Sequence, residues 1–205
     1  MTNPHRTESR SNPEKPSLRA FVLAAIASVM LSQPSASQQS PTTTPAGTEV
    51  APRGQREVKD LTYGDWKKLC FKPGGAKMIC RTSISGTFPT GQMAIRVDIT
   101  EREGDATARL QVFCPVGMYL PKPAKLTIDQ GKPHDVPYTW CLANACIAGT
   151  AADPTMVQEM SSGQMLRLEF VDSSLLSVST SLPLGQFASI HKGAPAQTFE
   201  QDIDE

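Results

Sequence analysis

Hydrophobicity alternates with a period of two through the central part of the chain, between residues 58 and 199. Apolar side chains occupy every second position in several short segments. These segments are separated by turns rich in Gly, Pro, Asn and Asp. Because successive side chains of a β-strand point to opposite faces, each segment predicts a half-buried, mostly antiparallel strand. The segments are residues 92–100, 107–113, 126–128, 166–170 and 176–179. Their spacing predicts an all-β fold, an antiparallel two-sheet β-sandwich.

One or two short helices are expected to interrupt this sandwich. Asp153 is suited to cap a helix N-terminus, Pro154 suits the first helical position, and Gly163 ends the run. A second candidate helix covers residues 184–192, and a glycine follows it.

The first 37 residues have the three-part pattern of a secretory signal peptide. A polar head with four Lys or Arg precedes residues 20–31, which are apolar apart from one Ser, and small residues follow. Twelve helical residues span about 18 Å, which is too short for a hydrocarbon core of roughly 30 Å. We predict cleavage between Ser37 and Gln38, a periplasmic or secreted mature protein, and no transmembrane span in it. An uncleaved anchor or a core helix is the alternative.

The rest of the chain divides into three parts by composition. Residues 38–56 hold three prolines and no aromatic side chain, so they predict a disordered linker that cannot bury enough apolar surface to order itself. Residues 57–196 are long enough for one hydrophobic core and predict a single β-sandwich domain. Residues 197–205 include four Asp or Glu and predict a loose, solvated acidic tail.

The chain has five cysteines, so at least one thiol remains if the others pair within the chain. Export permits disulfides. Cys141 and Cys146 flank a hairpin-sized loop, and Cys70 and Cys80 flank a Pro-Gly-Gly reversal, so we predict these two pairs. Cys114 is left as a free thiol at the end of an apolar strand, where it is expected to be buried as a small hydrophobic residue. A redox or nucleophilic role for it is the alternative.

The sequence shows no catalytic constellation. The predicted mature chain has two histidines, no G-x-S-x-G turn, no phosphate-binding glycine loop and no metal-ligand spacing, so no cofactor or metal is expected. Paired carboxylates at strand ends are the one arrangement left open, and they would suit a hydrolase acting on envelope polymers. The candidates are Asp98, Glu101, Glu169 and Asp172.

Charge is balanced overall but uneven along the chain. The 20 Lys and Arg equal the 20 Asp and Glu, which argues against binding to nucleic acid through a general positive field. Between residues 53 and 81, however, eight Lys or Arg stand against three Asp or Glu. This segment predicts a patch for an anionic lipid surface or an acidic partner, with a solvated hairpin face as the alternative. The basic residues are Arg53, Arg56, Lys59, Lys67, Lys68, Lys72, Lys77 and Arg81.

Several short motifs, in order, give residues 63–190 a resemblance to the invasion-associated locus B family of bacterial envelope proteins. The motifs are GDW (64–66), PVGMYL (115–120), LTID (126–129), CLANACIA (141–148) and SLPLGQF (181–187), with Cys70 and Cys80 after the first. The resemblance implies export, a β-sandwich fold and a link to host-cell invasion or envelope function. It carries over no catalytic residues. We therefore expect a non-catalytic, envelope-associated or binding module whose partner is an envelope protein, a host protein or an anionic lipid surface.

Overall fold

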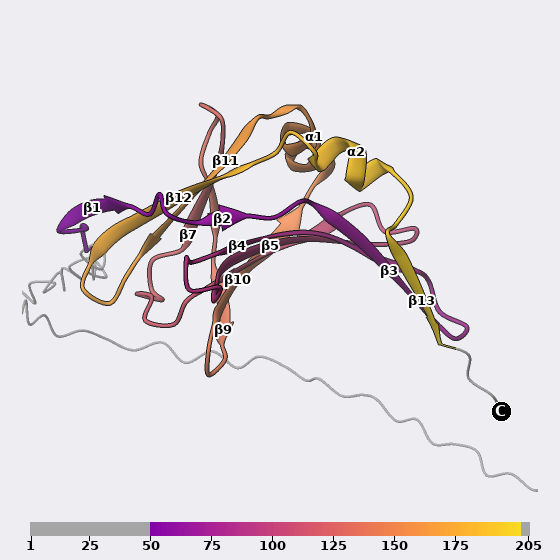
Figure 1. The fold of residues 1–205 in the computed structure, drawn as a ribbon, viewed down its shortest axis with the longest axis horizontal. Helices are drawn as coiled ribbons and strands as arrows, with labels where there is room; N and C mark the ends of the chain where they lie inside the picture. Colours follow the sequence, from indigo (N-terminus) through magenta and orange to yellow (C-terminus); the bar gives the residue numbers. More distant parts are fainter. Residues whose placement is uncertain (1–49, 202–205) are drawn as a thin grey trace, which may run out of the picture. The chain divides into compact units, whose positions relative to one another are not determined.

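The computed structural model describes residues 50–201. The predicted signal peptide, its cleavage site and most of the predicted linker lie outside the described residues. Within residues 50–201 the chain forms two β-sheets and two short helices. The sheets pack against each other around one hydrophobic core, which confirms the predicted all-β sandwich (Figure 1).

The smaller sheet has five strands among the described residues, in the order β1-β12-β11-β7-β8. Neighbouring strands in this sheet pair antiparallel, except that β1 runs parallel to β12. The strands are β1 (Gly54–Glu57), β7 (Ala124–Ile128), β8 (His134–Val136), β11 (Met165–Val171) and β12 (Leu176–Pro183).

The larger sheet has eight strands among residues 50–201, in the order β13-β3-β4-β5-β6-β10-β9, with β2 paired to β4. Among the described strands of this sheet, β13 alone pairs parallel, with β3. The sheet arches, and its concave side faces away from the smaller sheet and the helices (Figure 1). The strands are β2 (Thr62–Tyr63), β3 (Lys67–Pro73), β4 (Ile79–Thr87), β5 (Met93–Arg102), β6 (Ala108–Cys114), β9 (Tyr138–Cys141), β10 (Cys146–Ala152) and β13 (Gln197–Gln201).

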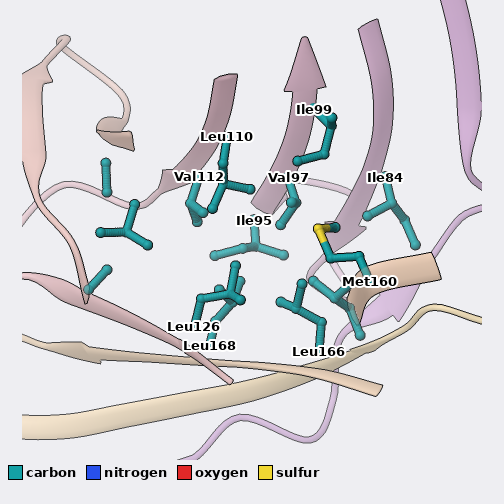
Figure 2. Close-up of a cluster of buried hydrophobic side chains, with 14 of the residues drawn as sticks. Ile84, Ile95, Val97, Ile99, Leu110, Val112, Leu126, Met160, Leu166 and Leu168 are labelled. Atoms are coloured by element: carbon teal, nitrogen blue, oxygen red, sulfur yellow. The ribbon is translucent and has the colours of Figure 1, made fainter. Parts of the chain in front are cut away.

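The core lies between the two sheets and is built from the apolar positions of the period-two pattern. On β5, Ile95, Val97 and Ile99 are buried, whereas Arg96 between them faces the other side of the sheet. Figure 2 shows these side chains and those of β6 pointing toward Leu126, Leu166 and Leu168 of the smaller sheet. Burial of such alternating side chains is the main force that holds the sheets together.

The two helices lie at one end of the sandwich (Figure 1). Helix α1 (Pro154–Ser162) begins as predicted, because the Asp153 carboxylate accepts a hydrogen bond from the Met156 N–H at 2.8 Å. Helix α2 (Phe187–Lys192) starts three residues later than predicted, since Leu184 belongs to a turn that accepts a hydrogen bond from Phe187 N–H. Neither helix within residues 50–201 is long and apolar enough to cross a membrane.

Both predicted boundaries of the sandwich domain need correction. The linker ends earlier than predicted, because Gly54–Glu57 forms β1, which pairs with β12. The acidic tail begins later than predicted, because Gln197–Gln201 forms β13, which pairs with β3. All five residues of β13 are exposed. Both strands are held by backbone hydrogen bonds at a sheet edge, and these need no apolar alternation. Composition therefore could not reveal them.

Candidate functional site

The end of the sandwich opposite the helices contains an open cleft of about 540 Å³. Its walls come from both sheets and from four loops: the segment after β1, the turn after β4, the loop after β6 and the turn after β11. A volume of this size suits a small ligand or a few inserted side chains. The cleft is the candidate functional site.

Most of the cleft surface is apolar. Ile95 on the larger sheet faces Phe170 and Val178 on the smaller sheet across the cleft. Loop residues extend the same surface to the mouth, where Val116 is 49% exposed. The apolar loop residues are Val58, Leu61, Phe88, Pro115, Val116 and Met118.

The loop after β6 is tied to the smaller sheet by its backbone. Gly117 has a φ of 88°, a left-handed conformation that glycine adopts without steric cost. Its carbonyl accepts a hydrogen bond from Ser173 N–H at 2.8 Å, and Tyr119 N–H donates to the Val171 carbonyl at 2.7 Å. The PVGMYL motif therefore links the two sheets at the cleft mouth.

A hydrogen bond between the Tyr63 and Thr180 hydroxyls, 2.7 Å long, joins the sheets beside the cleft. Tyr63 lies on β2, and its ring occupies the space beside Gly86 on β4. A Cβ at Gly86 would stand 2.6 Å from the Tyr63 ring, so the glycine is needed for this close approach. Burial raises the pKa of Tyr63, which therefore stays a neutral hydrogen-bonding phenol.

Two of the three carboxylates at the cleft rim are engaged in local structure. Asp172 accepts hydrogen bonds from Ser174 N–H and Leu176 N–H, each 2.9 Å long, and so shapes the turn before β12. Glu57 forms an ion pair with Lys59 at 3.3 Å. No histidine or cysteine is among the described residues that line the cleft. The apolar surface of the cleft can bind an apolar group.

The four carboxylates that the sequence singled out do not come together. Asp98 is buried against Arg96, with 3.1 Å between Oδ2 and Nε. Glu101 lies 3.3 Å from His191, whereas Glu169 lies on the smaller sheet near Arg167. Asp172 belongs to the turn at the cleft rim. The structure therefore assembles no carboxylate pair from this set.

The eight basic residues between 53 and 81 are also divided. Arg53, Arg56 and Lys59 lie in or beside β1 at the edge of the smaller sheet. Lys68 on β3 points inward and donates to the His191 carbonyl at 2.7 Å. The remaining four are on the β3–β4 hairpin of the larger sheet: Lys67, Lys72, Lys77 and Arg81.

The disulfides are Cys70–Cys80 and Cys141–Cys146, the two pairs that spacing predicts. Cys114 is a free, buried cysteine whose thiol donates to the Cys146 carbonyl at 3.5 Å. Burial raises the pKa of the Cys114 thiol to about 12, so the reactive thiolate is scarce at neutral pH. No cluster of three or more potential metal ligands occurs within residues 50–201.

Two of the sequence motifs meet at the helical end. Trp66 of GDW donates from its indole Nε1–H to the Pro183 carbonyl at 2.8 Å, and its ring meets Phe187 edge-on. Gln186 of SLPLGQF donates to Asp65 at 3.0 Å. These contacts close the helical end of the sandwich, so the two motifs have a structural role there.

Residues 66–195 match the sequence profile of the invasion associated locus B (IalB) protein. The chain belongs to the IalB family. The crystal structure of invasion associated protein b from Bartonella henselae is similar, with a TM-score of 0.55 and 20% identity over 63% of this chain and 91% of that chain. At this identity the likeness shows the fold alone. No curated protein matches the chain.

The IalB match begins at Trp66, so part of the cleft lies outside it. The wall that β1 and residues 58–61 form precedes the matched region. Sequence reasoning missed these residues, because Val58, Leu61 and Phe88 lie outside any periodic segment. Arg56 and Asp172, which the sequence singled out for other roles, line the cleft, and the PVGMYL motif indicated a family and not a site.

Proposed function

We propose that this IalB family member is an exported, envelope-associated binding module without catalytic activity, and that its partner is a protein. The apolar cleft at the open end carries the proposal. Export is supported by the sequence of residues 1–37 and by two disulfides, which persist in oxidising compartments. The separation of Asp98, Glu101, Glu169 and Asp172 supports the absence of catalysis.

The partner contributes an apolar segment in extended conformation. Strand β1 is at the edge of the smaller sheet, and Arg56 and Glu57 on it line the cleft. An extended segment can pair with such an edge through its backbone while alternate side chains enter the cleft. The rim carries Glu57, Asp60 and Asp172 against Arg56, so a neutral or basic segment fits better than an acidic one.

Selection from a random peptide display library tests this proposal. The mature protein should enrich peptides with alternating apolar residues and few acidic ones. Val116→Asp places a charge at the cleft mouth and should abolish the enrichment. Leu120→Asp is the matched control, because Leu120 is 47% exposed and does not line the cleft.

Two results would contradict the proposal. Enrichment that survives Val116→Asp would remove the cleft as the binding site. Turnover of envelope glycans or peptides by the purified mature protein would show an enzyme instead. Mass spectrometry of the protein from its host checks export separately, with a mature N-terminus at Gln38 expected.

A further inference from the structure

The outer, concave face of the larger sheet carries an excess of positive charge. Side chains on this face alternate with the buried core positions: Arg81 lies between Cys80 and Thr82, and Arg109 precedes the buried Leu110. Register places all of them on one face of neighbouring strands. The cations of this outer face are Lys67, Arg81, Arg96, Arg102 and Arg109.

A single carboxylate of the β-strands balances these five cations on the described part of this face. It belongs to Asp98, which is 1% exposed and pairs with Arg96. The Arg96 guanidinium also stacks over the Phe113 ring, 3.7 Å from its centroid. Arg81, Arg102 and Arg109 are exposed and form no ion pair with any residue in 50–201. These three guanidinium groups are available to a ligand.

A hollow of about 640 Å³ lies beside two of these three arginines. Arg102 and Arg109 line it from β5 and β6, and β10 contributes the small residues Gly149 and Ala151. Because these positions lack large side chains, the sheet surface drops next to Arg109. The lining of the hollow also contains polar groups: Thr100 adds a hydroxyl, and Asp105 in the turn after β5 adds a carboxylate.

The arginines are spaced across the sheet in a regular way. Arg81 pairs with Thr100, and Thr100 pairs with Arg109, so the two arginines are two strands apart in one cross-strand row. Two strand separations amount to about 10 Å. This spacing suits a linear polymer whose acidic groups recur along its length, since each guanidinium can bind one carboxylate through two parallel hydrogen bonds.

The shape of the face suits a single extended polymer chain. The cations lie on the outer face of the larger sheet, which is the concave side of the arch (Figure 1). A single chain can follow the curve. Trp140 on β9 is 55% exposed and lies opposite Ile147, next to the Phe113 row, where it offers an apolar ring to a sugar face.

We propose that the concave outer face of the larger sheet binds an acidic polysaccharide, with its carboxylates on Arg81, Arg102 and Arg109. The site is separate from the cleft of the proposed function. It is also distinct from β1 and its flanks, which carry Arg53, Arg56 and Lys59 of the basic segment that the sequence singled out.

Calorimetric titration of the mature protein with polygalacturonate tests this proposal. The double variant Arg81→Gln/Arg109→Gln should weaken binding by at least about tenfold, since each change removes a charge-assisted pair. The control Arg53→Gln/Lys59→Gln removes the same charge from exposed positions beside β1 and should change the affinity less than about twofold. Melting temperatures of both variants verify that they fold.

Further arms identify the ligand class. Dextran, a neutral polysaccharide, should not bind, and Val116→Asp should bind polygalacturonate like the wild type. Equal loss in both double variants, or no binding by the wild type, would overturn the proposal. So would equal or tighter binding to phosphatidylglycerol vesicles or to polyglutamate, because a membrane or an acidic polypeptide would then be the better ligand.

Discussion

The two ends of the sandwich are built differently. At the helical end, Phe187 stacks on His191 and meets Trp66 edge-on, with ring centroids 4.9 Å apart in both pairs, and each of the three residues is at most 6% exposed. At the opposite end, loop segments surround a cleft of about 540 Å³, and its mouth exposes Val116. One end is packed like a core, and the other is left open to a ligand.

The difference has a simple physical origin. Helices α1 and α2 each present an apolar face, through Met156 and Met160 or through Phe187, that can seal the space between two diverging sheets. The open end has only extended segments whose backbones pair at strand edges. Such segments satisfy hydrogen bonds without filling the volume between the sheets. Binding capacity therefore arises where the fold lacks an amphipathic element.

Truncating one phenylalanine at each end gives the sharpest contrast. Phe187→Ala should lower the free energy of unfolding by about 3–5 kcal/mol, because the ring is fully buried and leaves a cavity. Phe88→Ala at the cleft should cost less than about half of that, since its ring is partly exposed. Urea denaturation of both variants measures the two losses. Equal losses would mean that the open end is packed as firmly as the helical end.

The helical end should also respond to pH through His191. Burial lowers the pKa of His191 from 6.5, although Glu101 opposes the shift; Lys68 and Lys192 add to it, and Thr82 lies 3.3 Å from its Nδ1. The unfolded chain therefore binds this proton more readily, so stability is complete above pH 6.5 and falls as the pH drops below it. The slope is at most about 1.4 kcal/mol per pH unit.

Unfolding of wild type and His191→Phe between pH 5 and 8 isolates this effect. The wild type should lose stability toward pH 5, so the free energy of unfolding of the wild type minus that of His191→Phe should fall as the pH drops. The Asp98 carboxyl has a pKa raised by burial and acts with the opposite sign, but it is present in both proteins and cancels. A difference that grows toward acid pH would contradict the assignment.

The hydrogen bond beside the cleft should contribute less to the free energy of unfolding than burial of Phe187 or the titration of His191. Tyr63→Phe removes the bond to Thr180 and should cost about 1 kcal/mol. A double-mutant cycle with Thr180→Val measures the coupling between the two hydroxyls. A coupling near zero would show that Tyr63 stabilises this end through its ring alone.

The smallest change in stability is expected at the cleft mouth. Val116→Asp should alter the free energy of unfolding by no more than about 0.5 kcal/mol, because the side chain is 49% exposed. The same variant should lose peptide binding, so function and stability separate at this position. A large loss of stability would instead make the PVGMYL loop a structural closure like the helices.

Prediction from sequence succeeded where side chains carry the information. The alternation around Val97 and Ile99 predicted β5, and the Asp153-Pro154 pair predicted the start of α1. Short loops between cysteines predicted both disulfides. In each case the signal lies within about ten neighbouring residues, where local geometry decides the outcome.

Prediction was incomplete where distant segments meet. Strands β1 and β13 were placed in a linker and a tail, because edge pairing depends on backbone groups that every sequence has. The basic segment appeared as one patch, yet its residues divide between two sheets, and Arg102 and Arg109 of the outer face lie outside it. Proximity in sequence is a poor guide to charge on a sheet, because neighbours across strands come from remote positions.

The sequence by itself determined the fold class, the two disulfides, the buried apolar positions of the strands and membership of the IalB family, because each depends on local patterns or motif order. The tertiary structure alone decided that one end of the sandwich is sealed and the other open, and that three arginines share a concave face. Those properties depend on how two sheets diverge and on which strands become neighbours, and no short segment of the chain encodes either.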